Sequence, residues 1–360
     1  MIVYVLLTTI SLLCVSVKKF SFHKIDVLFF IIIGFLVGFR YFIGTDYASY
    51  IDYFNRVYTY GTANTEIAFD VVSKIAILLG LNFQGMFLIF AIITSFFYYI
   101  GYKYYFKDNE LNKLVFFIIF IIFVFPQITN GVRQIAASSI LFFSTKFIVQ
   151  KKFIKFMGLV TLASLFHFSS IIFIPLYLFI GKNFNKYFML FILLLGYVLG
   201  QLGIITAFLN YVINSNIKFL DVGNYISSYI DSPYNLRDFD FGIVALIQIG
   251  VLVFLIIFKN SIISDKKALL ALNGFLLYSL FLLFSFDARA FFRLSYLFSI
   301  YPAIAISSSI KVFNKESKYF AYILISFAYI LLLIFVGFKG SLEPSTSQII
   351  PFEFNFDIFR

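Results

Sequence analysis

The sequence has few charged residues and a single cysteine. Only 12% of its 360 residues are Asp, Glu, Lys or Arg, whereas 62% are hydrophobic. A soluble domain has about 25% charged residues, so this balance excludes a soluble globular protein and indicates a polytopic membrane protein. The lone Cys14 excludes a disulfide within one chain and a metal site built from several cysteines.

Cofactor motifs are also lacking. The glycines form no phosphate-cradling loop of the P-loop or dinucleotide type, and no divalent-metal motif stands out in the sequence. We therefore expect no cofactor and no bound metal. A net charge of +11 would suit nucleic acid, but the basic residues are scattered singly and in pairs between apolar runs. We interpret them as topology signals and expect no nucleic-acid partner.

Long apolar runs are what the sequence has in abundance. Most end at lysines or polar turns, and their length is typical of membrane helices rather than of barrel strands of about 10 alternating residues. The first run, Ile2 to Val17, lacks a basic start and a small-residue cleavage signal, so we expect a helix and not a signal peptide. About ten spanning helices are predicted. One of them is opened by the turn 127–134 and ends near 149, and the others are 2–17, 26–42, 84–102, 114–125, 187–209, 241–258, 268–286, 294–310 and 319–338.

Two runs do not fit a simple span. The run at 67–81 is short and carries an Asp, a Ser and a Lys, so we expect an interfacial or re-entrant helix. The run at 156–180 contains His167 at its midpoint and Pro175 beyond, and we expect a broken, re-entrant hairpin that lines a cavity. The predicted fold class is an all-α polytopic integral membrane protein, with residues 1–360 as a single membrane domain.

Lysines and arginines divide between two sides of the predicted topology. The positive-inside rule places the lysine-rich loops in the cytoplasm, which leaves the loops at about 43–66 and 210–240 and the tail at 339–360 outside. Lys and Arg count equally for topology, so the arginines indicate a chemical need for guanidinium, which makes planar, bidentate contacts with phosphate. We infer an outward-facing anionic ligand, most simply a phosphate-bearing lipid. All the arginines fall on the outer side: Arg40, Arg56, Arg133, Arg237, Arg289, Arg293 and Arg360.

These residues belong to short motifs that resemble a known family. The motifs are Arg40 with Gly44-Thr45-Asp46-Tyr47, Glu66 followed by Phe69, Arg133-Gln134 opening a helix, His167-x-Ser169 in a broken run, and Arg289 with Arg293 before Tyr296. In order and spacing they resemble the EpsG/Wzy-type polymerases of bacterial exopolysaccharide and O-antigen, over about residues 38–300. The resemblance implies an enzyme of the bacterial inner (cytoplasmic) membrane that moves a growing glycan from undecaprenyl pyrophosphate to the non-reducing end of a new lipid-linked repeat. Its implied partners are that lipid-linked oligosaccharide, membrane lipid and a chain-length regulator protein.

The arginines suit the leaving group of this reaction. Glycosyl transfer from a lipid pyrophosphate develops negative charge on the leaving phosphate, and preorganised cations lower that barrier. Interfacial snorkelling is the alternative for Arg40, for which Asp46 is a candidate partner. Helix-end anchoring or an ion pair with Asp287 is the alternative for Arg289 and Arg293. We predict pyrophosphate binding by Arg40, Arg133, Arg289 and Arg293, without a metal.

The acceptor hydroxyl needs a base, and Asp46, Glu66 and His167 are the catalytic candidates. An imidazole titrates near neutrality, but His167 could instead be buried in a helix break and hydrogen-bonded to Ser169. Glu66 could equally favour the start of the following helix through the helix dipole. The predicted substrate contacts are Tyr47, Tyr50, Gln134, Ser169 and Tyr296, with an interfacial aromatic belt as the alternative for the tyrosines. Carboxylates that could reach sugar hydroxyls but are usually solvated in loops are Asp52, Asp70 and Asp231.

Three other functions stay open at this point. A flippase or secondary transporter would show halves related by an internal repeat, and we find no convincing one. An O-antigen ligase would share the lipid-linked donor but usually has a larger outer loop than 210–240. A membrane acyltransferase would need an acidic cluster beside its histidine, which the apolar run around His167 does not supply. The polymerase is the preferred prediction, with ligase and flippase as alternatives.

Overall fold

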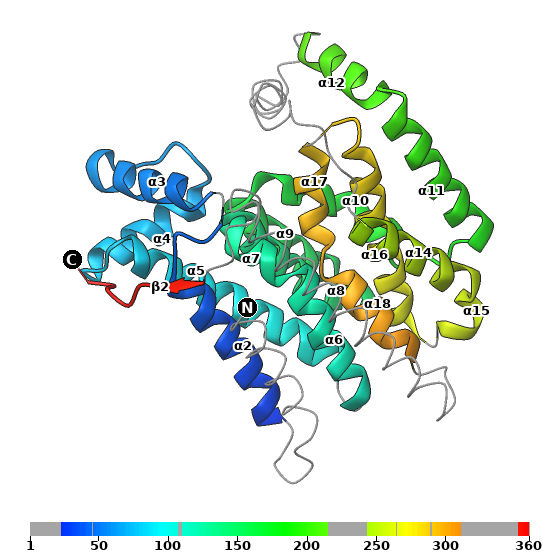
Figure 1. Ribbon diagram of the computed structural model, residues 1–360, viewed down its shortest axis with the longest axis horizontal. Coiled ribbons are helices and arrows are strands. Elements are labelled where there is room, and N and C mark those ends of the chain that lie inside the picture. The colour runs from blue at the N-terminus through cyan, green and yellow to red at the C-terminus, as the bar shows by residue number, and fades with distance from the viewer. Residues whose placement is uncertain are drawn as a thin grey trace. The chain divides into compact units, whose positions relative to one another are not determined.

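A computed structural model describes residues 23–44, 46–106, 110–214, 243–263, 265–288, 290–310 and 352–359 (Figure 1). These residues are mainly helical, with one two-stranded sheet. The chain divides into two compact units, one formed by Met1–Phe179 with Ile306–Arg360 and the other by Ile180–Ala305. The helices predicted at 2–17 and 319–338 and most of the loop at 210–240 lie outside the described residues.

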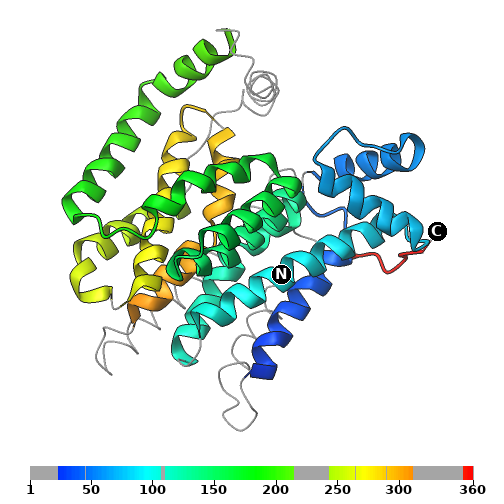
Figure 2. The same cartoon turned by 180° about the vertical axis from the view of Figure 1, so that it is seen from behind.

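The first unit is built around two long apolar helices, α5 and α8, which pack against each other. Helix α2 also packs against α5, and α9 packs against α8; the two views show α2 beside α5 (Figures 1 and 2). Aromatic side chains such as Phe29, Phe87 and Phe120 fill the core of this unit. Its helices are α2 (His23–Gly38), α3 (Tyr47–Tyr60), α4 (Ile67–Leu78), α5 (Phe83–Tyr105), α6 (Glu110–Phe123), α7 (Phe125–Asn130), α8 (Val132–Val149), α9 (Phe153–Phe166), η1 (Phe168–Ile172) and α10 (Phe173–Phe179).

The second unit is centred on α16, which contacts α11, α14 and α17. Asn273 of α16 donates from Nδ2 to the carbonyl oxygens of Ile180 (2.7 Å) and Lys182 (2.8 Å). A buried amide thereby fixes the segment that leads into α11. The helices that begin in this unit are α11 (Lys186–Gln201), α12 (Ile204–Asn214), α14 (Ile243–Ile257), α15 (Lys259–Ile262), α16 (Lys266–Phe284), α17 (Ala290–Ser295), η3 (Tyr296–Phe298) and α18 (Tyr301–Ser309).

Three described helices are long and apolar enough to cross a membrane, namely Phe83–Tyr105, Val132–Val149 and Lys266–Phe284. The helical segments Ala290–Phe298 and Tyr301–Ser309 are bent by 48° against each other and count as a fourth if the pair is one span. Other apolar helices in the described ranges have only 10–17 residues. The helical, membrane-type fold class is confirmed apart from the two short strands, whereas about ten full spans remains a prediction.

Several predicted boundaries differ from the structure. The segment 43–66 is not simply a loop, because its apolar residues recur with the helical period and α3 buries Tyr47, Tyr50 and Phe54 on one side. The helix predicted at 187–209 is divided between α11 and α12, and Gly203 at the break has a left-handed φ of 69°. The turn at 127–134 contains the short helix α7, and the helix predicted at 294–310 is the bent pair.

Of the two runs that did not fit a span, the first is one short helix and the second is divided into α9, η1 and α10. Helix α4 has 12 residues and is absent from the apolar helices found among the described residues. The run at 156–180 is broken as predicted, because α9 ends at Phe166 and His167 has the extended dihedrals φ −156° and ψ 119°. Whether either run is interfacial or re-entrant stays a prediction.

The C-terminal residues pair with the end of α2. Strand β2 (Glu353–Phe354) is antiparallel to β1 (Arg40–Tyr41), with Arg40 opposite Phe354. Asn82 donates from Nδ2 to the carbonyl oxygens of Asp357 (3.0 Å) and Phe359 (3.0 Å). The C-terminal residues are thereby held against β1 and against the turn between α4 and α5.

A buried ion pair joins α2 to α6. Lys113 Nζ lies 2.8 Å from Asp26 Oδ2, and both side chains are less than a tenth exposed. The sequence predicts the start of this helix at residue 114 and so leaves Lys113 in the preceding lysine-rich loop, whereas the structure begins α6 at Glu110. Lys113 lies within α6 and is retained in the core because a carboxylate neutralises its charge.

Candidate functional site

Three segments that are far apart in the sequence meet at Glu66. Its Oε2 accepts a hydrogen bond from Arg133 Nη1, and its Oε1 lies 2.7 Å from His167 Nδ1. The side chains of Glu66, Arg133 and His167 are 15%, 19% and 8% exposed. The structure therefore brings together one predicted pyrophosphate ligand and two predicted catalytic residues, in what we call the Glu66 cluster.

Local backbone geometry explains how each member reaches the cluster. Glu66 is the extended N-cap residue of α4, but its side chain makes no capping hydrogen bond. Arg133 is the second residue of α8, whose N-cap residue is Gly131. His167 is the extended residue between α9 and η1, so its ring leaves the helix axis at the break. All three side chains come from helix ends, where backbone direction changes.

The charge of Glu66 is fixed by its neighbours. Burial alone would raise the pKa of Glu66, but the hydrogen bond with His167 and the positive charge of Arg133 outweigh it and lower the pKa to about 2. Glu66 is therefore a carboxylate at any physiological pH. A carboxylate accepts, so Nδ1 of His167 carries the proton and Nε2 is the ring's basic nitrogen. Within the described residues, Nε2 has no hydrogen-bond partner.

Aromatic rings surround the guanidinium of Arg133. Its central carbon lies 5.6 Å from the ring centre of Tyr50, 5.4 Å from that of Tyr53 and 5.9 Å from that of Phe69. Such cation–π contacts hold a cation in place without neutralising it. Tyr50 was predicted to touch sugar, but it is buried and packs on Phe69, so its place in this structure is in the wall of the cluster.

Arg40 is enclosed instead of being directed at a ligand. It is fully buried, donates from Nη1 to the carbonyl oxygen of Val37 (2.6 Å) and from Nε to that of Ile43 (3.2 Å), and lies 4.4 Å from the ring centre of Phe87. Its guanidinium thus satisfies a carbonyl at the end of α2 and does not pair with Asp46. Its complete burial does not fit snorkelling to the membrane surface.

Gln84 connects Arg40 to Tyr47 and was missed by the sequence reasoning. Its Oε1 accepts from the Tyr47 hydroxyl (3.0 Å), and its Nε2 donates to the carbonyl oxygens of Gly38 (2.6 Å) and Arg40 (3.1 Å). Tyr47 is buried and stacks on Phe87 with ring centres 4.8 Å apart, so in this structure it presents no exposed face to a sugar. No sequence pattern distinguishes Gln84 from a glutamine at a solvated helix start.

The loop before α3 is fitted closely to the end of α7. Gly44 has a left-handed φ of 94°, and a Cβ there would lie 2.2 Å from the carbonyl oxygen of Thr129. Beside it, the N–H of Asp46 donates to Asn130 Oδ1 (3.1 Å), and Asp46 is half-buried. Only glycine suits this approach, and the contact places the Gly44–Asp46 motif a few residues from the start of α8.

The remaining predicted residues of the first unit are placed as follows. Gln134 is buried in α8. Ser169 Oγ is buried in η1 without a hydrogen-bond partner among the described residues, so the partner of His167 is Glu66 and not Ser169. Asp70 accepts from Thr62 Oγ1 (2.5 Å) and from the N–H of Ala63 (2.9 Å), and it therefore fixes the loop between α3 and α4.

The predicted residues near position 290 belong to the second unit. Arg289 lies outside the described residues, Arg293 is half-buried in α17, and Tyr296 is buried in η3. Asp287 does not pair with Arg293, because its Oδ2 accepts from the N–H groups of Ile205 (2.7 Å) and Thr206 (3.0 Å) and caps α12. In the part of the chain that the structure describes, no group of three or more His, Cys, Asp or Glu is placed to hold a metal ion.

The sequence model of the EpsG family matches residues 23 to 354, which include the whole Glu66 cluster. The chain belongs to the EpsG family. This confirms the resemblance read from the motifs. No curated protein and no solved structure matches the chain.

Membership of the EpsG family, together with the apolar helices, makes the chain an integral membrane protein. It also fits a polymerase-type role in polysaccharide synthesis, with a lipid-linked glycan as the class of substrate.

Proposed function

We propose that this EpsG-family protein is a polysaccharide polymerase. It transfers a growing glycan from undecaprenyl pyrophosphate to the non-reducing end of a lipid-linked repeat unit, on the outer face of the bacterial inner membrane. The observation that carries the proposal is the Glu66 carboxylate, held between Arg133 and His167. Family membership supports the class of substrate, and the predicted topology of about ten spans belongs to the same proposal.

His167 is the general base in this reaction. The acceptor hydroxyl oxygen bonds to the anomeric carbon of the growing chain while the bond from that carbon to the pyrophosphate oxygen breaks. The hydroxyl proton moves to Nε2 of His167, and the lipid pyrophosphate leaves with the electron pair. Glu66 orients the ring through Nδ1–H and stabilises the imidazolium that forms, which is how a carboxylate assists a histidine base.

Arg133 stabilises the charge of the leaving pyrophosphate. Its guanidinium is already desolvated and held by Glu66 and the rings of Tyr50 and Tyr53, so little reorganisation is needed when charge develops. Arg289 and Arg293 are proposed as further pyrophosphate ligands from the sequence alone. Arg40 is left out of this role, because it is fully buried and donates from Nη1 and Nε to the carbonyl oxygens of Val37 and Ile43.

The test is a strain deleted for the gene and complemented with single variants. The deletion should leave one repeat unit on the lipid or core, and wild type should restore a ladder of long chains on a gel. We expect His167→Gln and Arg133→Lys to fail, because the first loses the base and the second loses the planar guanidinium. Lys74→Gln, a charge change at an exposed position of α4, is the matched control and should restore the ladder.

Purified protein in liposomes that hold lipid-linked repeat units separates polymerisation from transport and ligation. A polymerase forms the ladder on the lipid carrier without a second acceptor. Long chains in the deletion strain would exclude the polymerase. If the deletion strain makes long chains that stay on the lipid carrier and never reach the core, this result would indicate a ligase.

A further inference from the structure

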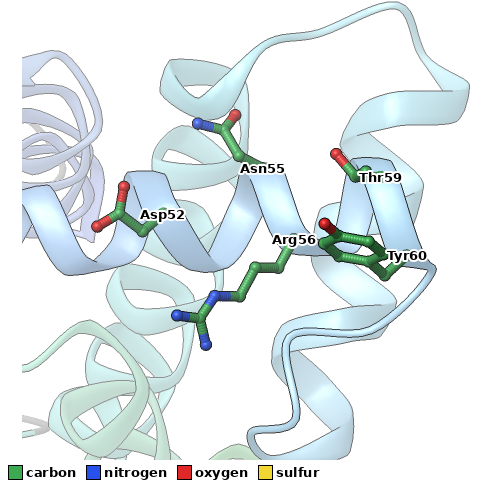
Figure 3. Close-up of a pocket in the computed structure, with 5 residues that line it drawn as sticks. All are labelled: Asp52, Asn55, Arg56, Thr59 and Tyr60. Carbon is green, nitrogen blue, oxygen red and sulfur yellow. The ribbon is translucent and has the colours of Figure 1, made fainter.

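The outer face of α3 is polar, exposed and hollowed. An open hollow of about 310 Å³ is lined by five residues of this one helix, drawn in Figure 3: Asp52, Asn55, Arg56, Thr59 and Tyr60. Their spacing of three and four residues places them on one side of the helix. The volume lies at the lower end of the range for small-molecule sites, about 300–1,000 Å³. The opposite side of α3 is buried and carries Tyr50.

The polar groups of this hollow are not used by the fold. Asp52 and Arg56 have opposite charges four residues apart, a spacing that favours pairing on a helix, yet they form no ion pair in the structure. Figure 3 shows the Asp52 carboxylate and the Arg56 guanidinium apart from each other. None of the five side chains makes a hydrogen bond to another described residue, so their donors and acceptors are available to a ligand.

A single tyrosine separates the hollow from the Glu66 cluster. The ring centre of Tyr53 lies 5.9 Å from the guanidinium carbon of Arg56 and 5.4 Å from that of Arg133. A glycan whose reacting end is at the cluster therefore needs to extend only past this ring to reach the hollow. An open hollow suits a polymer, because the rest of the chain must leave it.

We propose that the outer face of α3 is a subsite for the growing glycan chain, a few sugar units from its reacting end. The inference rests on the proposed polymerase function. Asp52, Asn55 and Thr59 offer acceptors and donors to sugar hydroxyls, and Tyr60 offers an aromatic ring to the apolar face of a sugar. Holding the chain between successive transfers keeps it on the enzyme, so this subsite sets chain length and not the first linkage.

The binding test uses the strain's own surface polysaccharide, cut to oligosaccharides and mixed with full-length protein in detergent micelles. Saturation-transfer NMR detects the sugar protons that contact the protein. We expect Asp52→Ala/Asn55→Ala and Tyr60→Ala to weaken binding about tenfold, the scale of losing one or two net hydrogen bonds. Tyr58→Ala is the matched control, because Tyr58 is an exposed tyrosine of the same helix that does not line the hollow.

The same variants, expressed in the deletion strain, should give ladders of shorter modal length with the first linkage still formed, while Tyr58→Ala gives the wild-type ladder. Unchanged binding with an unchanged ladder would overturn the proposal. So would shorter chains with unchanged binding, or loss of the first linkage in a variant that elutes normally on gel filtration. If the deletion strain keeps long chains, the polymerase function fails, whereas the NMR measurement still decides whether glycan binds at α3.

Discussion

Replacing Glu66 with glutamine tests the electrostatic argument for the Glu66 cluster. The variant keeps the shape of the side chain but removes the charge between Arg133 and His167. The pKa of Glu66 falls from its ordinary 4.5 to about 2 in the folded protein. At 1.36 kcal/mol per pKa unit, the ionised carboxylate stabilises the fold by about 3 kcal/mol. We expect Glu66→Gln to lose an amount of this order at neutral pH.

The pH dependence of this loss has a definite sign. Because the folded-state pKa is lower than the unfolded-state pKa, the stabilisation is fully present above about pH 4.5 and is lost as the pH falls toward 2. The stability difference between wild type and Glu66→Gln should therefore shrink as the pH falls below about 4.5. Thermal unfolding in detergent micelles at several pH values measures it, with Lys74→Gln as the control.

Two results would refute this reasoning. One is a Glu66→Gln variant as stable as wild type at pH 7, which would mean that the carboxylate is not held by its neighbours. The other is a stability difference that stays the same down to pH 2, which would mean that the effect does not come from ionisation of Glu66. In addition, polymer formation by Glu66→Gln at the wild-type rate would exclude Glu66 as the residue that orients His167.

Three further predictions concern the surroundings of the cluster. Gly44→Ala should destabilise the protein by about 3 kcal/mol, because a Cβ at this position meets the Thr129 carbonyl oxygen. Gly61→Ala, which has a similar φ of 80° but open space around the Cβ, should cost only about 1 kcal/mol. Equal losses of stability in thermal unfolding would exclude the steric argument. Gln84→Leu should cost about 3 kcal/mol by leaving the Tyr47 hydroxyl and two carbonyl oxygens unpaired, whereas Tyr47→Phe should cost about 1 kcal/mol; the reverse order would contradict the network. Lys113→Met should cost about 3–5 kcal/mol of stability, because it leaves Asp26 buried without its partner. The double variant Asp26→Leu/Lys113→Met should recover most of this loss, since an apolar pair needs no compensating charge. A double variant as unstable as the single one would contradict this account.

The sequence by itself determined the class of the protein and selected the residues that meet at Glu66. Hydrophobic run length is a local property, so the helical membrane fold and the break at His167 could be read directly. The motifs were specific enough to identify the EpsG family and to select Glu66, Arg133 and His167. By contrast, the helix α3 was missed, because a polar, Tyr-rich composition was interpreted as a loop although its apolar residues repeat at the helical period.

Only the tertiary structure decided which of these residues touch. Glu66 and His167 are 101 residues apart in the sequence, and periodicity shows which face of a helix is apolar without showing what that face meets. Burial likewise depends on neighbours from elsewhere in the chain. It therefore took the packed structure to show that Arg40 is enclosed while Arg133 stays partly exposed, and that Gln84 and the C-terminal strand support the end of α2.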